Sequence, residues 1–367
     1  MMENVTRVFL IDDSAIVRQQ ISQMIMNSEK NIIVVGTAMN GRIALEKMIL
    51  PRNKADVVII DVVMPEMDGI ETINHIMDRF PTPVIVISAL KKKKEIDVAL
   101  SELGVAAFES GTVEFVRKPD PWIPNDKERF KNELILKIEN LAKIDFLKIF
   151  SIFNIESLVK EEAIAKPLIK EPSQVILNRH RAKIIVIGAS TGGPRAISMI
   201  FSMLPNNFPP ILVIQHMPIG MVKPWVTRLK KMYSNLMIEV ANNGVLLRPN
   251  HIYIAPSGKH CLVNHNKRIK LESGEKVNFV IPSADVTFKS VAEVFGKDSL
   301  GIILTGMGQD GCRGARIIKD SGGKIIAEDE STSIIPSMPK AVIEGELADR
   351  ISPLHKIPTS IRGLGWI

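Results

Sequence analysis

A chain of 367 residues is too long for one ordinary hydrophobic core and suits two domains of about 100–200 residues each. Its composition, 46% hydrophobic and 24% charged, is globular, and no apolar run approaches the ~20 residues that cross a bilayer, so we expect a cytoplasmic protein without membrane insertion. The formal net charge of +7 comes with no basic helix-turn-helix and no arginine-aromatic stripe, which argues against nucleic acid as a partner.

The first part of the chain alternates aliphatic runs with helical stretches. The runs are residues 7–13, 32–38, 57–63, 83–88 and 113–119. Five such runs with helices between them predict a doubly wound five-stranded parallel sheet with both faces covered. Asn125, with Glu128 three residues later, predicts the N-cap of a closing helix. We therefore expect a first domain over residues 1–145 and a linker over residues 146–180, where prolines interrupt helical fragments.

A second series of strands and helices follows the linker. Its aliphatic runs are residues 183–190, 210–217, 237–241, 251–257, 300–307 and 323–329. Residues 261–264 and 268–272 predict a β-hairpin within this series. The pattern indicates a second doubly wound, Rossmann-like α/β domain over residues 181–367.

Polar side chains follow four of the predicted strands of the first domain. Asp12 and Asp13 end the first strand, Asp61 the third, Ser88 the fourth and Lys118 the fifth. Because ligands of open α/β sheets bind beyond the carboxyl ends of the strands, we expect these side chains to converge at one edge. Three crowded carboxylates require a hard cation with oxygen ligands, most simply Mg²⁺.

The segments LIDDS, IIDVVMPEMDG, VIVISAL and EFVRKP resemble the receiver domain of two-component response regulators over residues 5–122. The resemblance implies a phosphoryl acceptor at Asp61, Mg²⁺ held by Asp12, Asp13 and Asp61, phosphoryl contacts from Ser88 and Lys118, and a switch aromatic at Phe115. The segment between Ser88 and Lys118 is several residues longer than usual, which leaves partner contacts there open. Its four consecutive lysines, residues 91–94, are interpreted as a solvated face.

A serine at the tip of a glycine turn opens the second domain. The run IIVIGASTGG places Ser190 in the G-x-S-x-G pattern of a nucleophile elbow. A serine nucleophile needs a histidine base and an acid that orients it. His216 and Asp310 both follow strands at the carboxyl edge where Ser190 is expected, whereas Asp285 is a rival acid that could instead cap its own helix. His260 is expected at the surface.

Two other functions compete for the same residues. Residues 306–311 match G-x-G-x-x-G and are followed about 20 residues later by Glu328 and Asp329, as a dinucleotide site requires. Against this hypothesis, Asp310 would point a carboxylate at the pyrophosphate. A non-catalytic module that relays a signal is the third possibility, and it would need neither Ser190 nor His216.

The segments IGASTGGPRAI, VIQHMPIGM, HIYIAPSGKH, PSADVTFKSVA and LTGMGQDG resemble the catalytic domain of chemotaxis protein-glutamate methylesterases over residues 183–355. The resemblance implies a triad of Ser190, His216 and Asp310, with the backbone N–H of Met307 in the oxyanion hole. It further implies methyl-accepting chemoreceptors as substrates, demethylated or deamidated on glutamyl and glutaminyl side chains, and a chemotaxis histidine kinase as phosphodonor. No cofactor is expected for ester hydrolysis.

Overall fold

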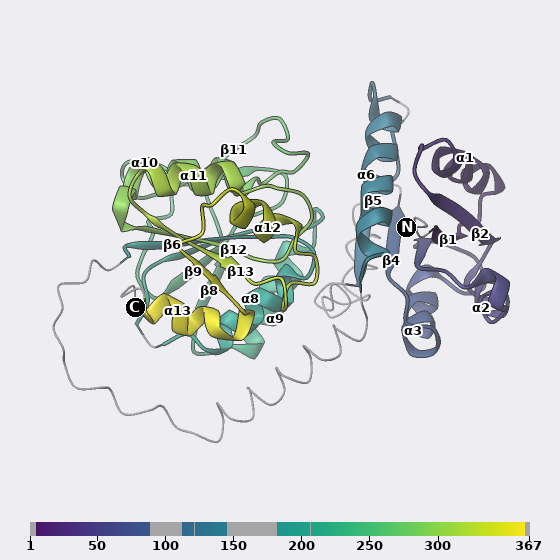
Figure 1. Cartoon of the computed structure of the whole chain (residues 1–367), viewed down its shortest axis with the longest axis horizontal. Coiled ribbons are helices and arrows are strands. Elements are labelled where there is room, and N and C mark those ends of the chain that lie inside the picture. The colour runs from purple at the N-terminus through teal and green to yellow at the C-terminus, as the bar shows by residue number, and fades with distance from the viewer. Residues whose placement is uncertain (1–4, 89–111, 121, 145–181, 206, 364–367) are drawn as a thin grey trace, which may run out of the picture. The chain divides into compact units, whose positions relative to one another are not determined.

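The computed structural model describes residues 5–88, 112–120, 122–144, 182–205 and 207–363. The chain divides into two compact units, Met1–Phe146 and Leu147–Ile367 (Figure 1). The predicted linker and the four consecutive lysines lie outside the described residues. Each unit has a sheet and an apolar core of its own.

The first unit contains a five-stranded sheet in the order β2-β1-β3-β4-β5. Its strands are β1 (Thr6–Ile11), β2 (Ile32–Ala38), β3 (Val57–Asp61), β4 (Val84–Ser88) and β5 (Val113–Arg117). All pairings are parallel, and the residues of the inner strands β3 and β4 are buried on both faces. The predicted doubly wound parallel sheet is confirmed.

The helices of the first unit are α1 (Ala15–Met26), α2 (Gly41–Met48), the short η1 (Pro51–Asn53), α3 (Gly69–Arg79) and α6 (Asp126–Leu141). Helices α1 and α6 share one apolar core with the sheet, in which Ile25 meets Phe130, Leu134 and Ile138. Helix α2 packs against α3. The sheet is therefore held between helices, and its carboxyl edge stays open for polar residues.

Helix α6 begins where the sequence indicated, but not by the capping that was expected. Asn125 has a φ of 60° and its side chain makes no capping hydrogen bond. The first-turn acid Asp126 instead binds Arg117 and the backbone N–H of Asp120. Asn125 is thus the N-cap residue, as predicted, but it caps the helix through no side-chain hydrogen bond, and the ion pair of Asp126 with Arg117 of the preceding strand holds the start of the helix.

The second unit is built on a seven-stranded sheet in the order β14-β13-β12-β6-β7-β9-β8. Its strands are β6 (Ile184–Ala189), β7 (Ile211–Gln215), β8 (Met237–Val240), β9 (His251–Ile254), β12 (Ser299–Ile303), β13 (Lys324–Glu328) and β14 (Arg350–Ser352), all in parallel pairs. Strands β10 (His260–Val263) and β11 (Ile269–Glu272) form the predicted antiparallel hairpin.

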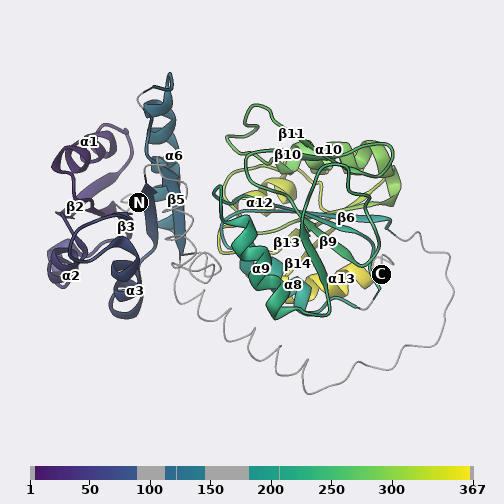
Figure 2. The same ribbon diagram turned by 180° about the vertical axis from the view of Figure 1, so that it is seen from behind.

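Helices cover both faces of this sheet. They are α8 (Gly193–Ser202), α9 (Val222–Met232), α10 (Ala284–Phe295), α11 (Cys312–Asp320), α12 (Ser337–Glu344) and α13 (Ile357–Gly363), with the short η2 (Gly296–Asp298) and η3 (Leu354–Lys356). Figures 1 and 2 show α10, α11 and α12 on one face and α8, α9 and α13 on the other. This arrangement confirms the predicted doubly wound α/β unit with a hairpin.

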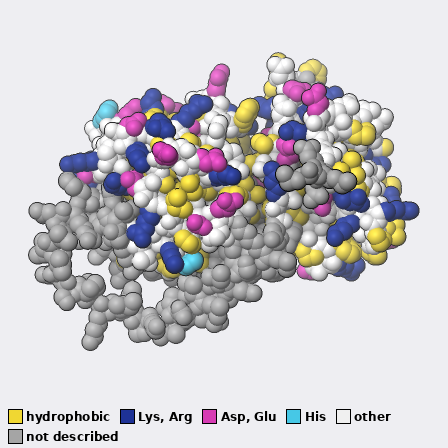
Figure 3. All heavy atoms as spheres, viewed as in Figure 1, with side chains coloured by type: hydrophobic (Ala, Val, Ile, Leu, Met, Phe, Trp, Pro, Cys, Tyr) yellow, Lys and Arg dark blue, Asp and Glu magenta, His cyan; other side chains and the backbone are white. Residues whose placement is uncertain are grey.

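The described surface is mixed in charge. On the face shown in Figure 3, Lys and Arg side chains lie among Asp and Glu side chains, and no broad field of one sign covers the coloured atoms. Among the residues that the structure describes, no helix is both long and apolar enough to span a membrane.

Gly69, the first residue of α3, lies against the end of β3. A Cβ at this position would meet the Asp61 carbonyl oxygen at 2.2 Å and the Val62 Cα at 2.8 Å. We expect Gly69→Ala to destabilise the first unit by about 1–3 kcal/mol, because backbone atoms cannot move aside as side chains do. Urea unfolding of the full chain tests this, with Asn74→Ala on the exposed side of α3 as the control. Equal stability of both variants would contradict the tight contact.

Candidate functional sites

The carboxyl edge of the first sheet gathers three acidic side chains. Carboxylate oxygens of Asp12, Asp13 and Asp61 lie within 4.8 Å of one another. Asp12 and Asp61 are buried, whereas Asp13 is exposed. Such a set of oxygen donors, open to solvent on one side, fits a hard divalent cation that keeps some of its waters.

Lys118 brings one positive charge to this cluster. Its Nζ donates to Asp12 Oδ2 at 2.7 Å and also to Asp61 Oδ2. Burial is the largest influence on Asp61 and raises its pKa, and the hydrogen bond from Lys118 opposes this shift without cancelling it. Burial lowers the pKa of Lys118, but its bonds to the two carboxylates outweigh burial and leave the pKa raised. One lysine cannot neutralise three carboxylates, so the cluster attracts a cation.

The two remaining predicted residues of the first unit lie on the neighbouring strands. Ser88 ends β4 and is 3% exposed, and its backbone carbonyl accepts a hydrogen bond from the Lys118 backbone N–H at 2.9 Å. Phe115 is buried in β5, three residues before Lys118, and its carbonyl accepts from Lys137 Nζ at 2.7 Å. Ser88 is therefore at the acidic edge, whereas Phe115 lies within the strand.

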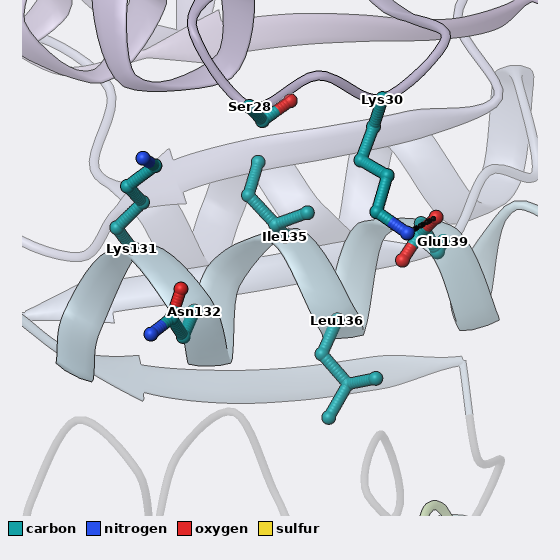
Figure 4. Close-up of a pocket in the computed structure, with 7 residues that line it drawn as sticks. All are labelled: Ser28, Lys30, Lys131, Asn132, Ile135, Leu136 and Glu139. Carbon is teal, nitrogen blue, oxygen red and sulfur yellow. Dashed lines mark ion pairs between the residues drawn. The ribbon is translucent and has the colours of Figure 1, made fainter. Parts of the chain in front are cut away.

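A shallow pocket opens elsewhere on the first unit, between α6 and the loop that follows α1 (Figure 4). Lys30 reaches from the loop to Glu139 of α6 and forms an ion pair of 3.0 Å, beside Ile135. None of the predicted site residues lines this pocket. The pocket is therefore separate from the acidic edge of the sheet.

In the second unit, Ser190 lies at the turn between β6 and α8. Gly192 has a φ of 78°, which glycine adopts freely, and the Gly193 N–H closes the turn on the Ser190 carbonyl at 2.8 Å. Pro194 stands in the first turn of α8, where its missing N–H costs no hydrogen bond. The side chain of Gln215 donates to the Ser190 carbonyl at 2.8 Å. The turn thus holds Ser190 half-buried at the carboxyl edge.

His216 follows β7, the strand next to β6. Ala189 pairs with Gln215 in the parallel register, and the His216 N–H donates to the Ala189 carbonyl at 3.0 Å. The ring Nε2 lies 2.9 Å from Asp310 Oδ2, while Nδ1 is buried without a hydrogen-bond partner among the described residues. An ionised Asp310 accepts the Nε2 proton, which leaves the Nδ1 lone pair free.

Asp310 is buried and surrounded by hydrogen-bond donors. Its Oδ1 accepts from Ser283 Oγ at 2.6 Å, and its Oδ2 from the Ala284 N–H at 2.6 Å. Burial raises the pKa of this carboxyl, but the bond and charge of His216, with the bonds from Ser283 and Ala284, outweigh burial and lower the pKa to about 2. Asp310 is therefore ionised at neutral pH and fixed in position.

The backbone beyond β12 approaches Ser190 at Gly306. The Ser190 N–H donates to the Thr305 carbonyl at 3.0 Å, and the Gly306 N–H donates to the Ile335 carbonyl at 2.8 Å. Neither N–H group is therefore available to a substrate. Gly306 packs so closely that a Cβ would lie 2.7 Å from Ser190 Cβ. Within the described part of the chain, the next N–H, that of Met307, has no backbone acceptor.

Two expectations for neighbouring residues are wrong. Asp285 does not cap its own helix, because its Oδ1 accepts from the N–H groups of Gly311 at 2.9 Å and Gly314 at 2.8 Å, at the start of α11. His260 is not a surface residue but is 6% exposed. Its Nδ1 accepts from the Ser283 N–H at 3.3 Å. Both residues brace the surroundings of the acid, which the sequence spacing did not reveal.

The dinucleotide hypothesis loses one of its two acidic candidates, Glu328. Glu328 is fully buried and accepts from the Thr305 N–H at 2.8 Å and from Thr332 Oγ1 at 3.0 Å. Asp310, in the glycine-rich loop, is likewise committed to His216. Glu328 is therefore not available to a ribose, whereas the second acid of the hypothesis, Asp329, is only partly buried and accepts from the Ser331 N–H at 2.9 Å. The loop presents no cradle free of negative charge, because it carries Asp310.

Sequence reasoning missed three residues that hold the site together, namely Gln215, Asn278 and Ser283. Gln215 ends an otherwise aliphatic buried strand, and a polar residue in that position is a signal that could have been used. Ser283 is the residue before α10, and its hydroxyl binds Asp310 instead of capping the helix. Asn278 carried no signal, since its loop is remote from Asp310 in the sequence.

Comparison with known proteins agrees with both halves of this geometry. Residues 8–121 match the response regulator receiver domain family, and residues 185–361 match the CheB methylesterase family. A protein-glutamate methylesterase/protein-glutamine glutaminase of Thermotoga maritima is 36% identical over 365 residues, covering 98% of this chain and 99% of the relative. One from Methanosarcina mazei is 35% identical over 369 residues, covering 98% of this chain and 96% of its own.

A solved catalytic domain is also similar. The CheB methylesterase catalytic domain of Thermotoga maritima shares 42% identity with a TM-score of 0.48, covering 50% of this chain and 98% of that domain. The two family matches define a methylesterase with a receiver domain, and both resemblances drawn from the sequence are confirmed. The chain belongs to the protein-glutamate methylesterase/protein-glutamine glutaminase family.

The lowered pKa of Asp310 makes stability depend on pH. A carboxyl whose folded pKa is about 2 against an ordinary 3.8 stabilises the folded state by about 2 kcal/mol above pH 4. This contribution is lost as the pH falls through 2. Wild type should therefore lose about 2 kcal/mol more unfolding free energy between pH 5 and pH 2 than Asp310→Asn does. Urea titrations at each pH measure the difference, and parallel pH curves would rule it out.

Proposed function

We propose that this chain is a serine hydrolase that cleaves glutamyl γ-methyl esters on chemoreceptors and deamidates receptor glutamines, under control of phosphorylation in its receiver unit. The observation that carries the proposal is the bond of Asp310 to His216 Nε2 on the strand next to Ser190. This bond leaves Nδ1 of His216 to accept a proton at the sheet edge where the turn after β6 holds the Ser190 hydroxyl. The family and its two-domain layout agree with this function.

In the acylation step, Ser190 Oγ attacks the ester carbonyl and His216 Nδ1 takes the hydroxyl proton. Asp310 holds the ring in the tautomer that carries its proton on Nε2 and stabilises the imidazolium that forms. The proton on Nδ1 then passes to the leaving group, so that methanol departs and an acyl-enzyme remains. The acid itself stays ionised throughout, in keeping with its lowered pKa.

The Met307 N–H is assigned to the developing oxyanion. Its lack of an internal acceptor among the described residues and its position after Gly306, against Ser190, support this role. Water then attacks the acyl-enzyme with His216 as base, and the glutamyl carboxylate is released. An amide substrate passes through the same tetrahedral oxyanion and releases ammonia instead of methanol, which joins the two activities in one site.

In the receiver unit, Asp61 is assigned as the phosphoryl acceptor and a histidine kinase of the chemotaxis system as the donor. Asp12, Asp13 and Asp61 would hold Mg²⁺, which when bound offsets the negative charge of the carboxylates and the phosphoryl group. Lys118 already contacts Asp61 and can turn to the phosphoryl oxygens, and Ser88 ends the adjacent strand. Phe115 is assigned as the switch aromatic. A phosphoryl group would redistribute these contacts.

Methanol release from methylated chemoreceptor membranes tests the catalytic assignment. Ser190→Ala should abolish release, and Asp310→Asn should lower turnover by about a thousandfold or more, since the histidine loses its fixed tautomer. The matched variant Asp285→Asn changes a carboxylate that caps α11, so its turnover should fall by less than about tenfold. A larger effect at Asp285 than at Asp310 would transfer the acid's role to Asp285.

Phosphorylation control is tested with a small-molecule phosphodonor and Mg²⁺. Wild type should release methanol faster when the donor is added, whereas Asp61→Asn should show no stimulation because the acceptor oxygen is lost. Each tenfold of activation requires only about 1.4 kcal/mol of differential stabilisation between inactive and active arrangements. Stimulation that survives in Asp61→Asn would remove this residue from its role.

A further inference from the structure

A tight turn connects the hairpin strand β11 to the active-site helix α10. Val277 and Val280 pair across it, with hydrogen bonds of 3.1 Å in both directions. The two residues between them, Asn278 and Phe279, have φ angles of 52° and 66°. Positive φ at both central residues characterises the type I′ turn, which favours Asn followed by Gly. Asn278 suits its position, whereas Phe279 occupies the place where glycine would be free of strain.

The Phe279 side chain does not pack in the folded core, so its burial does not offset the strain of its backbone. Its side chain is 80% exposed, which makes it the most exposed large hydrophobic residue of the described second unit. A bulky residue with positive φ is an outlier that costs free energy, and such residues gather at functional sites. An exposed ring held in a strained turn therefore calls for a function outside the folded core.

The neighbouring side chain of the turn points the other way. Asn278 Nδ2 donates to Asp310 Oδ1 at 3.1 Å and to Asp285 Oδ2 at 2.7 Å. Of the two central residues of the turn, Asn278 thus binds the proposed catalytic acid, and Phe279 exposes an apolar ring. Movement of one residue cannot leave the other in place.

The turn is also joined to the loop that follows His216. The Gly258 N–H donates to the Ile281 carbonyl at 3.3 Å, and a Cβ at Gly258 would touch Ile219 Cδ1 at 3.5 Å. Ile219, three residues after His216, is 54% exposed. A polypeptide that brings a glutamyl side chain to Ser190 must cover the loops that carry His216 and contact Asp310. Ile219 and Phe279 are the exposed apolar residues on those loops.

We propose that the 277–280 turn is a substrate-docking element, in which Phe279 packs on apolar side chains of the receptor segment that carries the target glutamyl group, while Asn278 is a positioning residue for Asp310. This inference rests on the proposed function and specifies how its protein substrate is held. Binding energy from contacts remote from the ester orients the reacting group, which a small ester cannot exploit. The strained turn is then retained for recognition.

The first test replaces the ring without disturbing the turn. Phe279→Gly keeps the positive φ at no steric cost, so its melting temperature should equal or exceed that of wild type. With phosphodonor present, its KM for methylated receptor membranes should rise about tenfold, as loss of an aromatic contact predicts. Its kcat/KM for a small soluble ester, N-acetylglutamate γ-methyl ester, should stay within about twofold. Met237→Ala, which replaces an apolar residue that is 60% exposed at the start of β8, is the control and should change neither.

The second test removes only the amide. Asn278→Gly also keeps the turn, but Asp310 loses a donor, so kcat should fall about tenfold on receptor membranes and on the small ester alike, with KM little changed. A purely structural role would lower the melting temperature without this split between KM and kcat. Equal kcat for Asn278→Gly and wild type would remove the positioning role.

Other outcomes overturn the docking role. An unchanged KM of Phe279→Gly for receptor membranes would do so. Faster methanol release by Phe279→Gly than by wild type without phosphodonor would also do so, because the ring would then restrain the receiver unit instead of binding the receptor. Hydrolysis of the small ester by wild type, abolished in Ser190→Ala, reports on the hydrolase independently. If wild type hydrolyses neither substrate, the proposed function fails and the docking role fails with it. If only the docking prediction fails, the hydrolase remains.

Discussion

Two carboxylates cap each other's helices, and the active site depends on this exchange. Asp310 lies two residues before α11 but accepts hydrogen bonds from the N–H groups of Ala284 and Asp285 at the start of α10. Asp285 belongs to α10 but accepts from Gly311 and Gly314 at the start of α11. A helix N-terminus stabilises negative charge, so each helix holds the acid of the other. Asp310, which we propose as the acid of the triad, is therefore also a structural tie between two helices.

This exchange separates the two carboxylates chemically. Burial, aided by the charge of Asp310, raises the pKa of Asp285, whereas the pKa of Asp310 is lowered to about 2 because His216, Ser283 and Ala284 outweigh its burial. Neighbouring acids whose pKa values are pushed apart can take different roles. Here one remains a fixed negative charge beside the imidazole, and the other completes the packing of α11.

The sequence predicted what depends on strand ends and missed what depends on loops. The parallel strands put Ser190, His216 and Asp310 at one edge, and Asp12, Asp13 and Asp61 at another, because a strand's carboxyl end follows from its place in the sheet. Pattern reasoning could not find Asn278, which reaches Asp310 from a turn 32 residues earlier in the chain. His260 was misplaced because a hairpin's sequence does not say which of its faces packs on a helix, here α10. Contacts between loops depend on packing, which local patterns do not encode.

Gly306 shows how strongly such packing limits the residues that evolution can place at one position. A single methyl group there would lie 2.3 Å from Met338 Sδ and 2.9 Å from the Ser190 backbone nitrogen. A residue larger than glycine therefore cannot occupy position 306 unless Ser190 moves. A lineage that needed a different residue here would first have to rebuild α12 and the serine turn together. This position is closed to gradual change, although it contributes no side chain to the chemistry.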